Sequence, residues 1–124
     1  MIFVITSMFE TILKGLVLKL YSNAKMPGTL DETKDYDEVT GGGYEPITLD
    51  KNLWDITLNL NKPSVATLPE QIFTFTGEVG NVYGYFVVQE FSGKIMWAER
   101  FIEGPYKIQN DGDQIKISLK VYLK

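Results

Sequence analysis

The sequence predicts an all-β fold: an antiparallel β-sandwich of jelly-roll or Greek-key type with one short N-terminal helix. Three observations lead to this prediction. Short segments repeatedly alternate apolar with polar residues, glycine- or proline-containing turns separate them, and no helical pattern is interleaved between them. Because two cores of about 60 residues each would be marginal, the 124 residues are expected to form a single β domain spanning 1–124.

Residues 1–14 are expected to form an N-terminal arm and a short helix. Ser7 and Glu10 have the S-x-x-E arrangement in which a hydroxyl and a carboxylate satisfy backbone N–H groups at a helix start. Gly15 stands where a left-handed residue would end that helix. The run from Met1 to Ile5 is apolar without a positive flank, so we expect neither a signal peptide nor a membrane span. Its apolar surface must be covered by the chain's own core or by a neighbouring subunit, and the sequence leaves both open.

Alternation of apolar and polar residues sets the expected strands and their faces. In the first strand, Leu16, Leu18 and Leu20 share one face. Residues 82–88 are nearly apolar on both faces and are therefore expected to form a central strand. The expected strands are 16–21, 44–49, 54–60, 71–76, 82–88, 94–102 and 115–123, and residues 65–68 form a short apolar piece between Pro63 and Pro69.

Residues 22–43 are expected to form a long acidic, glycine-rich loop. Connections of this length are uncommon and are usually functional or disordered, so the loop is a candidate contact arm. Its carboxylates between Asp31 and Glu38 could bind Ca²⁺, but their spacing matches no EF-hand loop, and a solvated acidic loop is the simpler interpretation. Gly41 to Gly43 lack the Lys-Ser/Thr pair of a phosphate-binding loop and predict a turn or hinge.

Composition argues against several kinds of function. The chain has no cysteine and no histidine, which removes thiolate chemistry, the commonest general base and the commonest metal ligand. Its formal net charge of −4 repels phosphate backbones. We therefore expect a non-enzymatic protein with no catalytic residues, no cofactor, no metal site, and neither nucleic acid nor membrane as a partner.

The order of these motifs resembles a small β-sandwich module of tailed-bacteriophage virion structural proteins, described as capsid decoration (cement) or tail-fibre-like proteins. The resemblance covers most of the chain and lies in the pattern rather than in one diagnostic motif. The segments that carry it are the short N-terminal helix, Gly15–Asn23, Glu38–Tyr44, Phe73–Phe75, Val82–Val87, Ile95–Phe101 and the strand start at Gly112-Asp113. It implies a role in virion assembly, by attachment to a capsid lattice or a tail structure, and supplies no catalytic motif.

We therefore expect a capsid decoration protein that binds and stabilises the phage head, located in the virion after assembly in the host cytoplasm. Its expected partners are the major capsid protein or other virion proteins, and further copies of itself in a homo-oligomer. The alternative is a tail-fibre or baseplate module that recognises host surface glycans, and a carboxylate-based polysaccharide hydrolase is a third. The residues expected to contact partners are Ile2, Phe3, Val4, Met8, Phe9, Asp31, Asp35, Tyr36, Asp37 and Tyr44.

Two further groups of residues have both a functional and a structural interpretation. Lysines on one face of the last strand could meet an acidic partner or could protect an edge strand from aggregation: Lys116, Lys120 and Lys124. Large aromatic residues are enriched at interfaces but usually fill cores when they lie in strands, so only exposed ones are interface candidates among Trp54, Tyr83, Tyr85 and Trp97.

Overall fold

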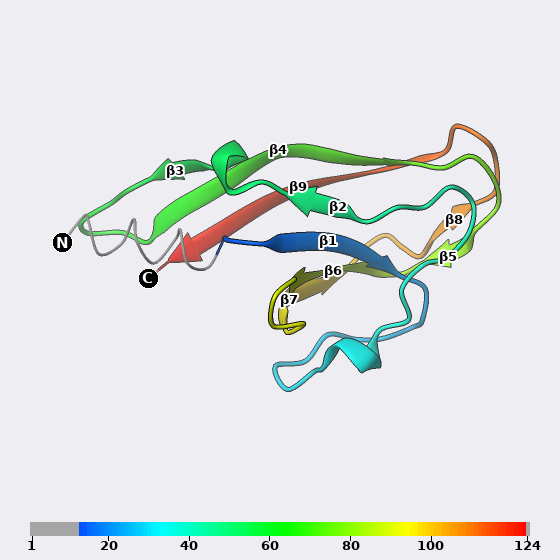
Figure 1. The fold of residues 1–124 in the computed structure, drawn as a ribbon, viewed down its shortest axis with the longest axis horizontal. Coiled ribbons are helices and arrows are strands. Elements are labelled where there is room, and N and C mark those ends of the chain that lie inside the picture. Colours follow the sequence, from blue (N-terminus) through cyan, green and yellow to red (C-terminus); the bar gives the residue numbers. More distant parts are fainter. Residues whose placement is uncertain (1–12, 124) are drawn as a thin grey trace.

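The computed structural model describes residues 13–123, which form an antiparallel β-sandwich (Figure 1), so the predicted fold class is confirmed. The strands are β1 (Leu16–Tyr21), β2 (Ile47–Leu49), β3 (Asp55–Thr57), β4 (Ser64–Thr74), β5 (Gly80–Val82), β6 (Gly84–Gln89), β7 (Ile95–Arg100), β8 (Tyr106–Ile108) and β9 (Gln114–Leu123). Two short 3₁₀ helices join them, η1 (Thr33–Asp35) and η2 (Lys51–Leu53). Within the described residues no helix is long and apolar enough to cross a membrane.

The strands form two main sheets and one small sheet, and all pairings are antiparallel. The four-stranded sheet has the order β2-β1-β6-β7, and the three-stranded sheet has the order β3-β4-β9. β1 pairs with β6 and β4 pairs with β9, which brings together strands far apart in the sequence, as Greek-key connections do. In Figure 1 the two main sheets form separate layers, and the β5–β8 pair closes one end of the sandwich.

The main hydrophobic core lies between the two sheets. Leu16, Leu18 and Leu20 of β1 are fully buried there, as their alternation predicts. On β9, Ile115, Ile117 and Leu119 are buried in this core, whereas Lys116 and Lys120 are exposed. Since β9 is an edge strand of its sheet, the position of these lysines fits the interpretation that they protect the edge.

One long strand of the three-stranded sheet joins a predicted strand to the apolar piece that precedes it. Residues 65–68 and 71–76 belong largely to the single strand β4, because a bulge between Leu68 and Gln71 accommodates Pro69 without ending the pairing with β9. The predicted core side of this segment is confirmed, since Phe73 and Phe75 are buried.

Two other predicted strands differ from the observed ones in length. The segment 54–60 contains only the three-residue strand β3, and Leu60 is 72% exposed instead of facing the core. The segment 82–88 is divided at Tyr83, because the chain passes there from the small sheet into the four-stranded sheet. The second part, β6, is central and buried on both faces, as predicted.

The N-terminal prediction and the loop prediction have different outcomes. The short helix expected within residues 1–14 falls largely on residues 1–12, which lie outside the described residues, whereas Gly15 has the left-handed φ expected of it, at 66°. The loop 22–43 is not structureless. It contains η1, pairs with the end of β1 through a bridge between Tyr21 and Glu38, and folds back beside the four-stranded sheet, away from the other sheet (Figure 1).

Candidate partner-binding site

The acidic loop, residues 22–43, is anchored on the outer face of the four-stranded sheet by a second hydrophobic cluster. Tyr36 of the loop is only 5% exposed. Its ring lies 4.9 Å from the ring of Tyr21 in an edge-on contact and 5.1 Å from the ring of Phe86 in a stacked contact. Such aromatic pairs add to the stabilisation that comes from burial itself. The loop is therefore attached to the folded body and is not a free arm.

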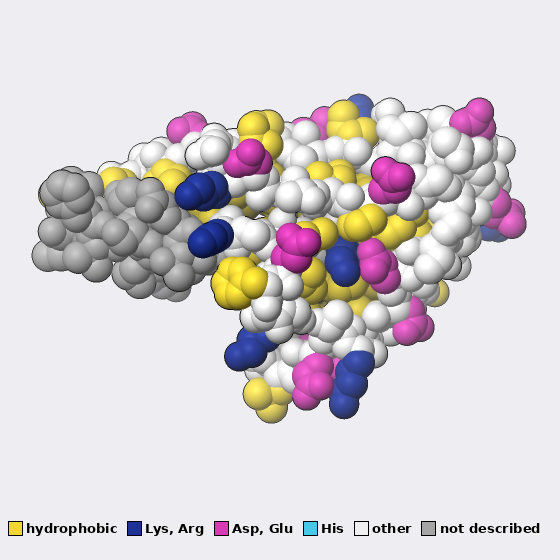
Figure 2. Space-filling view, in the orientation of Figure 1, with side chains coloured by type: hydrophobic (Ala, Val, Ile, Leu, Met, Phe, Trp, Pro, Cys, Tyr) yellow, Lys and Arg dark blue, Asp and Glu magenta, His cyan; other side chains and the backbone are white. Residues whose placement is uncertain are grey.

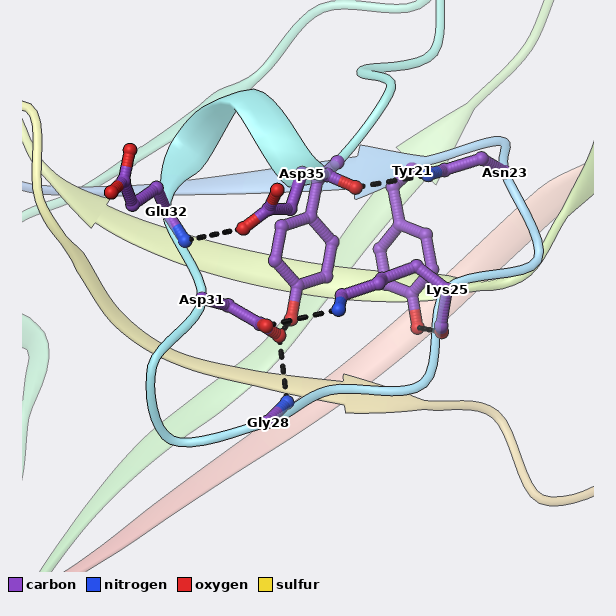
Figure 3. A network of polar contacts seen from close by, with 8 residues as sticks. Tyr21, Asn23, Lys25, Gly28, Asp31, Glu32 and Asp35 are labelled. Atoms are coloured by element: carbon purple, nitrogen blue, oxygen red, sulfur yellow. Dashed lines mark hydrogen bonds and ion pairs between the residues drawn. The ribbon is translucent and has the colours of Figure 1, made fainter.

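Asp31 is the polar centre of the acidic loop (Figure 3). Its carboxylate accepts hydrogen bonds from the Gly28 N–H at 2.6 Å and the Tyr36 O–H at 2.7 Å. It also forms an ion pair with Lys25 Nζ at 2.9 Å. The Tyr36 hydrogen bond, followed by those of Gly28 and Lys25, lowers the pKa of Asp31 to about 2. The charge of Asp31 is thus used to close the loop upon itself.

Further hydrogen bonds hold the stem of the loop. The Asn23 side chain donates to the backbone carbonyl of Asp35 at 3.0 Å, and the Asp35 carboxylate accepts from the Glu32 N–H at 2.8 Å at the start of η1 (Figure 3). Thr33 Oγ1 donates to the carbonyl of Gly93 at 2.7 Å. This last bond ties the loop to the turn between β6 and β7.

Tyr44 closes the other end of the loop. Its ring stacks on Phe73, with centroids 5.9 Å apart. Its hydroxyl donates to the Glu38 carboxylate at 2.7 Å and accepts from the Leu20 N–H at 3.2 Å. Leu20 lies beyond Leu18, the last residue of β1 that pairs with β2. The Tyr44 hydroxyl therefore supplies the acceptor that a neighbouring strand would otherwise provide.

Gly41 to Gly43 form a turn, as predicted. All three have positive φ, at 79°, 56° and 74°. A Cβ atom on Gly42 would collide with the Val79 side chain, and one on Gly43 with Thr76. The backbone conformation favours glycine at all three positions, and close packing also favours it at Gly42 and Gly43.

The buried tyrosines have raised pKa values. Burial is the largest cause for Tyr36, Tyr44 and Tyr85, and the carboxylates of Asp31 and Glu38 reinforce it for the first two. These hydroxyls remain protonated near neutral pH. Those of Tyr36 and Tyr44 donate the hydrogen bonds that hold the loop.

The acidic loop projects from the body of the molecule and exposes apolar side chains at its end. Met26 is 68% exposed and Leu30 is 93% exposed. Figure 2 shows the projection with acidic, basic and hydrophobic side chains on its surface. A pocket of about 430 Å³ lies between Gly28, Asp31 and Tyr36 on the loop side and residues 95–98 of β7. The site therefore combines a fixed loop, an exposed apolar tip and a pocket beside an edge strand.

Nine of the ten predicted contact residues fall into three groups. Ile2, Phe3, Val4, Met8 and Phe9 lie outside the described residues. The acidic residues Asp31 and Asp35 and the half-buried Tyr44 bond within the chain, while Asp37 is exposed and stays a candidate contact.

Tyr36 is buried in the second cluster, so most of its side chain anchors the loop instead of forming an exposed contact surface. The sequence pattern did not indicate the residues that support it, namely Tyr21, Asn23 and Lys25, or the exposed tip, Met26 and Leu30. The sequence feature that could have indicated these supporting residues is the polar run just after β1, in which an amide and a lysine precede the acidic residues.

Two other sequence interpretations can be compared with the structure. Among residues 13–123, no group of three or more acidic side chains is arranged to hold a metal ion. Of the strand aromatics, Trp54 and Tyr85 are buried and Tyr83 and Trp97 are half-buried, so core packing accounts for them.

No family model, curated protein or solved structure that we compared with this chain matches it.

Proposed function

We propose that this chain is a non-enzymatic structural protein of a bacteriophage virion, a capsid decoration protein that binds the major capsid protein and stabilises the head. The observation that best supports this role is the projecting loop. A buried aromatic anchor and a charged network hold the loop in place, yet Leu30 at its tip is 93% exposed. A loop that only joined two strands would not need such an arrangement.

Rigidity of the loop favours binding for a physical reason. A flexible segment loses conformational freedom when it binds, and this loss opposes association. In the acidic loop that freedom is already lost on folding, because Asp31 bonds to Gly28 on one side of the tip and to Tyr36 on the other. The exposed apolar side chains can then be buried against a shell protein with little further ordering.

The direct test is to ask where the protein lies in the particle. Cryo-electron microscopy of virions should show its density on the outer surface of the head, and particles lacking it should lose their DNA at a lower temperature. Absence of the protein from the head, or heads of unchanged stability without it, would contradict the proposal.

A pair of leucine variants tests the loop tip. Leu30→Asp should weaken binding of the purified protein to heads by about 10- to 100-fold, because burial of a leucine side chain contributes roughly 1.5–3 kcal/mol. Leu60→Asp is the matched control, since Leu60 is also exposed, at 72%, but lies near β3. Equal binding of the two variants in a co-sedimentation assay would show that the loop tip is not the contact.

A further inference from the structure

Strand β7 forms one edge of the four-stranded sheet, and within the described part of the chain its strand partner is β6 alone. The other edges are less open to pairing. β2 and β3 have three residues each, and the longer β9 exposes Lys116 and Lys120. β7 has six residues, and its two charged residues, Glu99 and Arg100, lie at one end, so residues 95–98 are uncharged and only half-buried. An edge of this length and composition is suited to pairing with another strand.

The backbone groups that face away from β6 can be identified. The Phe101 N–H donates to the Tyr83 carbonyl at 2.9 Å and so points toward β6. Successive residues of a strand direct their N–H and C=O groups to opposite sides, so those of Glu99 also point toward β6. The groups of Ala98 and Arg100 therefore point away from the sheet. A strand added to this edge would bond through these two residues.

There is space beside this edge. The pocket of about 430 Å³ is lined by the four consecutive residues 95–98 and therefore follows the strand for part of its length. Asp31 of the acidic loop lines the same pocket. Asp31 is already paired with Lys25, but residues 22–43 hold five carboxylates against two lysines, and this negative excess favours a cationic side chain on an added strand.

We propose that a second copy of this chain occupies the edge, with the two β7 strands paired antiparallel across a two-fold axis. This inference rests on the proposed function in one respect, that the chain works by binding other protein chains. A two-fold contact is the commonest way in which identical chains associate, and it would join the two four-stranded sheets into one continuous sheet.

Charge selects the register of this pairing. With bonds through Ala98 and Arg100, the residue on the two-fold axis is Ala98, Glu99 or Arg100. An axis through Glu99 or Arg100 places two like charges directly opposite each other, which is destabilising. An axis through Ala98 avoids both like-charge pairs. It places Trp97 opposite Glu99 of the second copy. It also places Arg100 of the second copy across from Met96, at the pocket that Asp31 lines.

Proline at the axis is the most direct test. Ala98→Pro removes the outward N–H that the second copy would use, while the bonds between β6 and β7 remain, because that N–H does not face β6. The wild-type protein should sediment as a dimer at micromolar concentration. The variant should dissociate at least about 10-fold more readily, since two symmetric hydrogen bonds are lost. Circular dichroism checks its fold, and Ala98→Lys, which sets like charges on the axis, replaces it if it fails to fold.

Engineered cysteines test the register, and the natural chain has no cysteine to interfere. Two Ala98 residues paired on the axis would have Cα atoms about 5.5 Å apart, within the range that a disulfide spans. Mild oxidation should therefore convert Ala98→Cys to a covalent dimer. Glu99→Cys should react poorly, because its two copies lie beyond about 7 Å in this register. Ser118→Cys on the exposed face of β9 gives the background rate.

The outcomes separate this inference from the proposed function. A monomeric wild-type protein, a dimer that Ala98→Pro leaves intact, or cross-linking of Glu99→Cys as fast as Ala98→Cys would each overturn the proposed dimer. A monomer whose binding to heads is abolished by Ala98→Pro would assign the edge to a shell protein instead of a second copy. A dimer with the expected cross-links that binds no virion would support this inference and contradict the proposed function.

Discussion

The anchoring of the acidic loop can be tested by replacing Tyr36 with alanine. The ring is 5% exposed and lies 4.9 and 5.1 Å from two aromatic rings of the sheet. Removing a buried aromatic side chain typically lowers the free energy of unfolding by about 3–5 kcal/mol, because apolar contacts are lost and a cavity remains. For a chain of this size that corresponds to a fall in Tm of roughly 10–20 °C. Urea unfolding followed by circular dichroism measures the loss in the free energy of unfolding.

Two further variants separate the parts of this effect. Tyr36→Phe keeps the ring and removes the hydroxyl that donates to Asp31, so it should lose less stability than Tyr36→Ala. Tyr122→Ala is the control, since Tyr122 is 58% exposed and its replacement should change the free energy of unfolding by no more than about 0.5 kcal/mol. A loss below about 1 kcal/mol in Tyr36→Ala would refute the conclusion that this ring anchors the loop.

Three further predictions concern charge and close packing. The pKa of Asp31 is lowered to about 2 from 3.8, so its contribution to stability is present above pH 3.8 and is lost as the pH falls toward about 2. Over that interval the difference in unfolding free energy between wild type and Asp31→Asn should shrink, and Asp37→Asn, whose parent residue is exposed in the same loop, serves as the control. Four of the seven tyrosines have raised pKa values, so their contribution is present below pH 10 and is lost above it. Their phenolate absorbance should appear together with alkaline unfolding, and titration in the folded state would contradict this. Gly84→Ala should lower the unfolding free energy by roughly 1–3 kcal/mol, because the new Cβ would collide with a backbone carbonyl, whereas Gly77→Ala meets nothing and should be nearly neutral.

The part of the fold that the sequence predicts is the part controlled by local alternation. β1 and β9 were expected within a residue or so of their observed bounds, because their apolar residues face a single core with a period of two. The prediction fails where tertiary context overrides a local signal. Pro69 reads as a strand end, yet pairing with β9 on both sides of it continues the strand through a bulge.

The candidate site was less predictable, because its contacts join residues far apart in the chain. Composition marks residues 22–43 as an acidic loop but does not reveal that Tyr36 packs on Phe86, fifty residues later. That contact depends on the outward face of β6 being apolar, which the sequence does show. Without a residue packed on it, the apolar outer face of β6 would be exposed to solvent, and Tyr36 of the loop packs there.

The proposed shell contact and the proposed dimer contact use different residues, but both lie next to Asp31. Leu30 lies at the loop tip, whereas Ala98 lies on β7, so each surface can be altered without changing the other's contact atoms. Both adjoin Asp31, which fixes the loop through Gly28 and Tyr36 and also lines the pocket beside β7. Release of the loop would therefore disturb the tip and one wall of the pocket together. A single anchor that positions two surfaces explains why a connecting segment of this fold carries a buried tyrosine and a charged network.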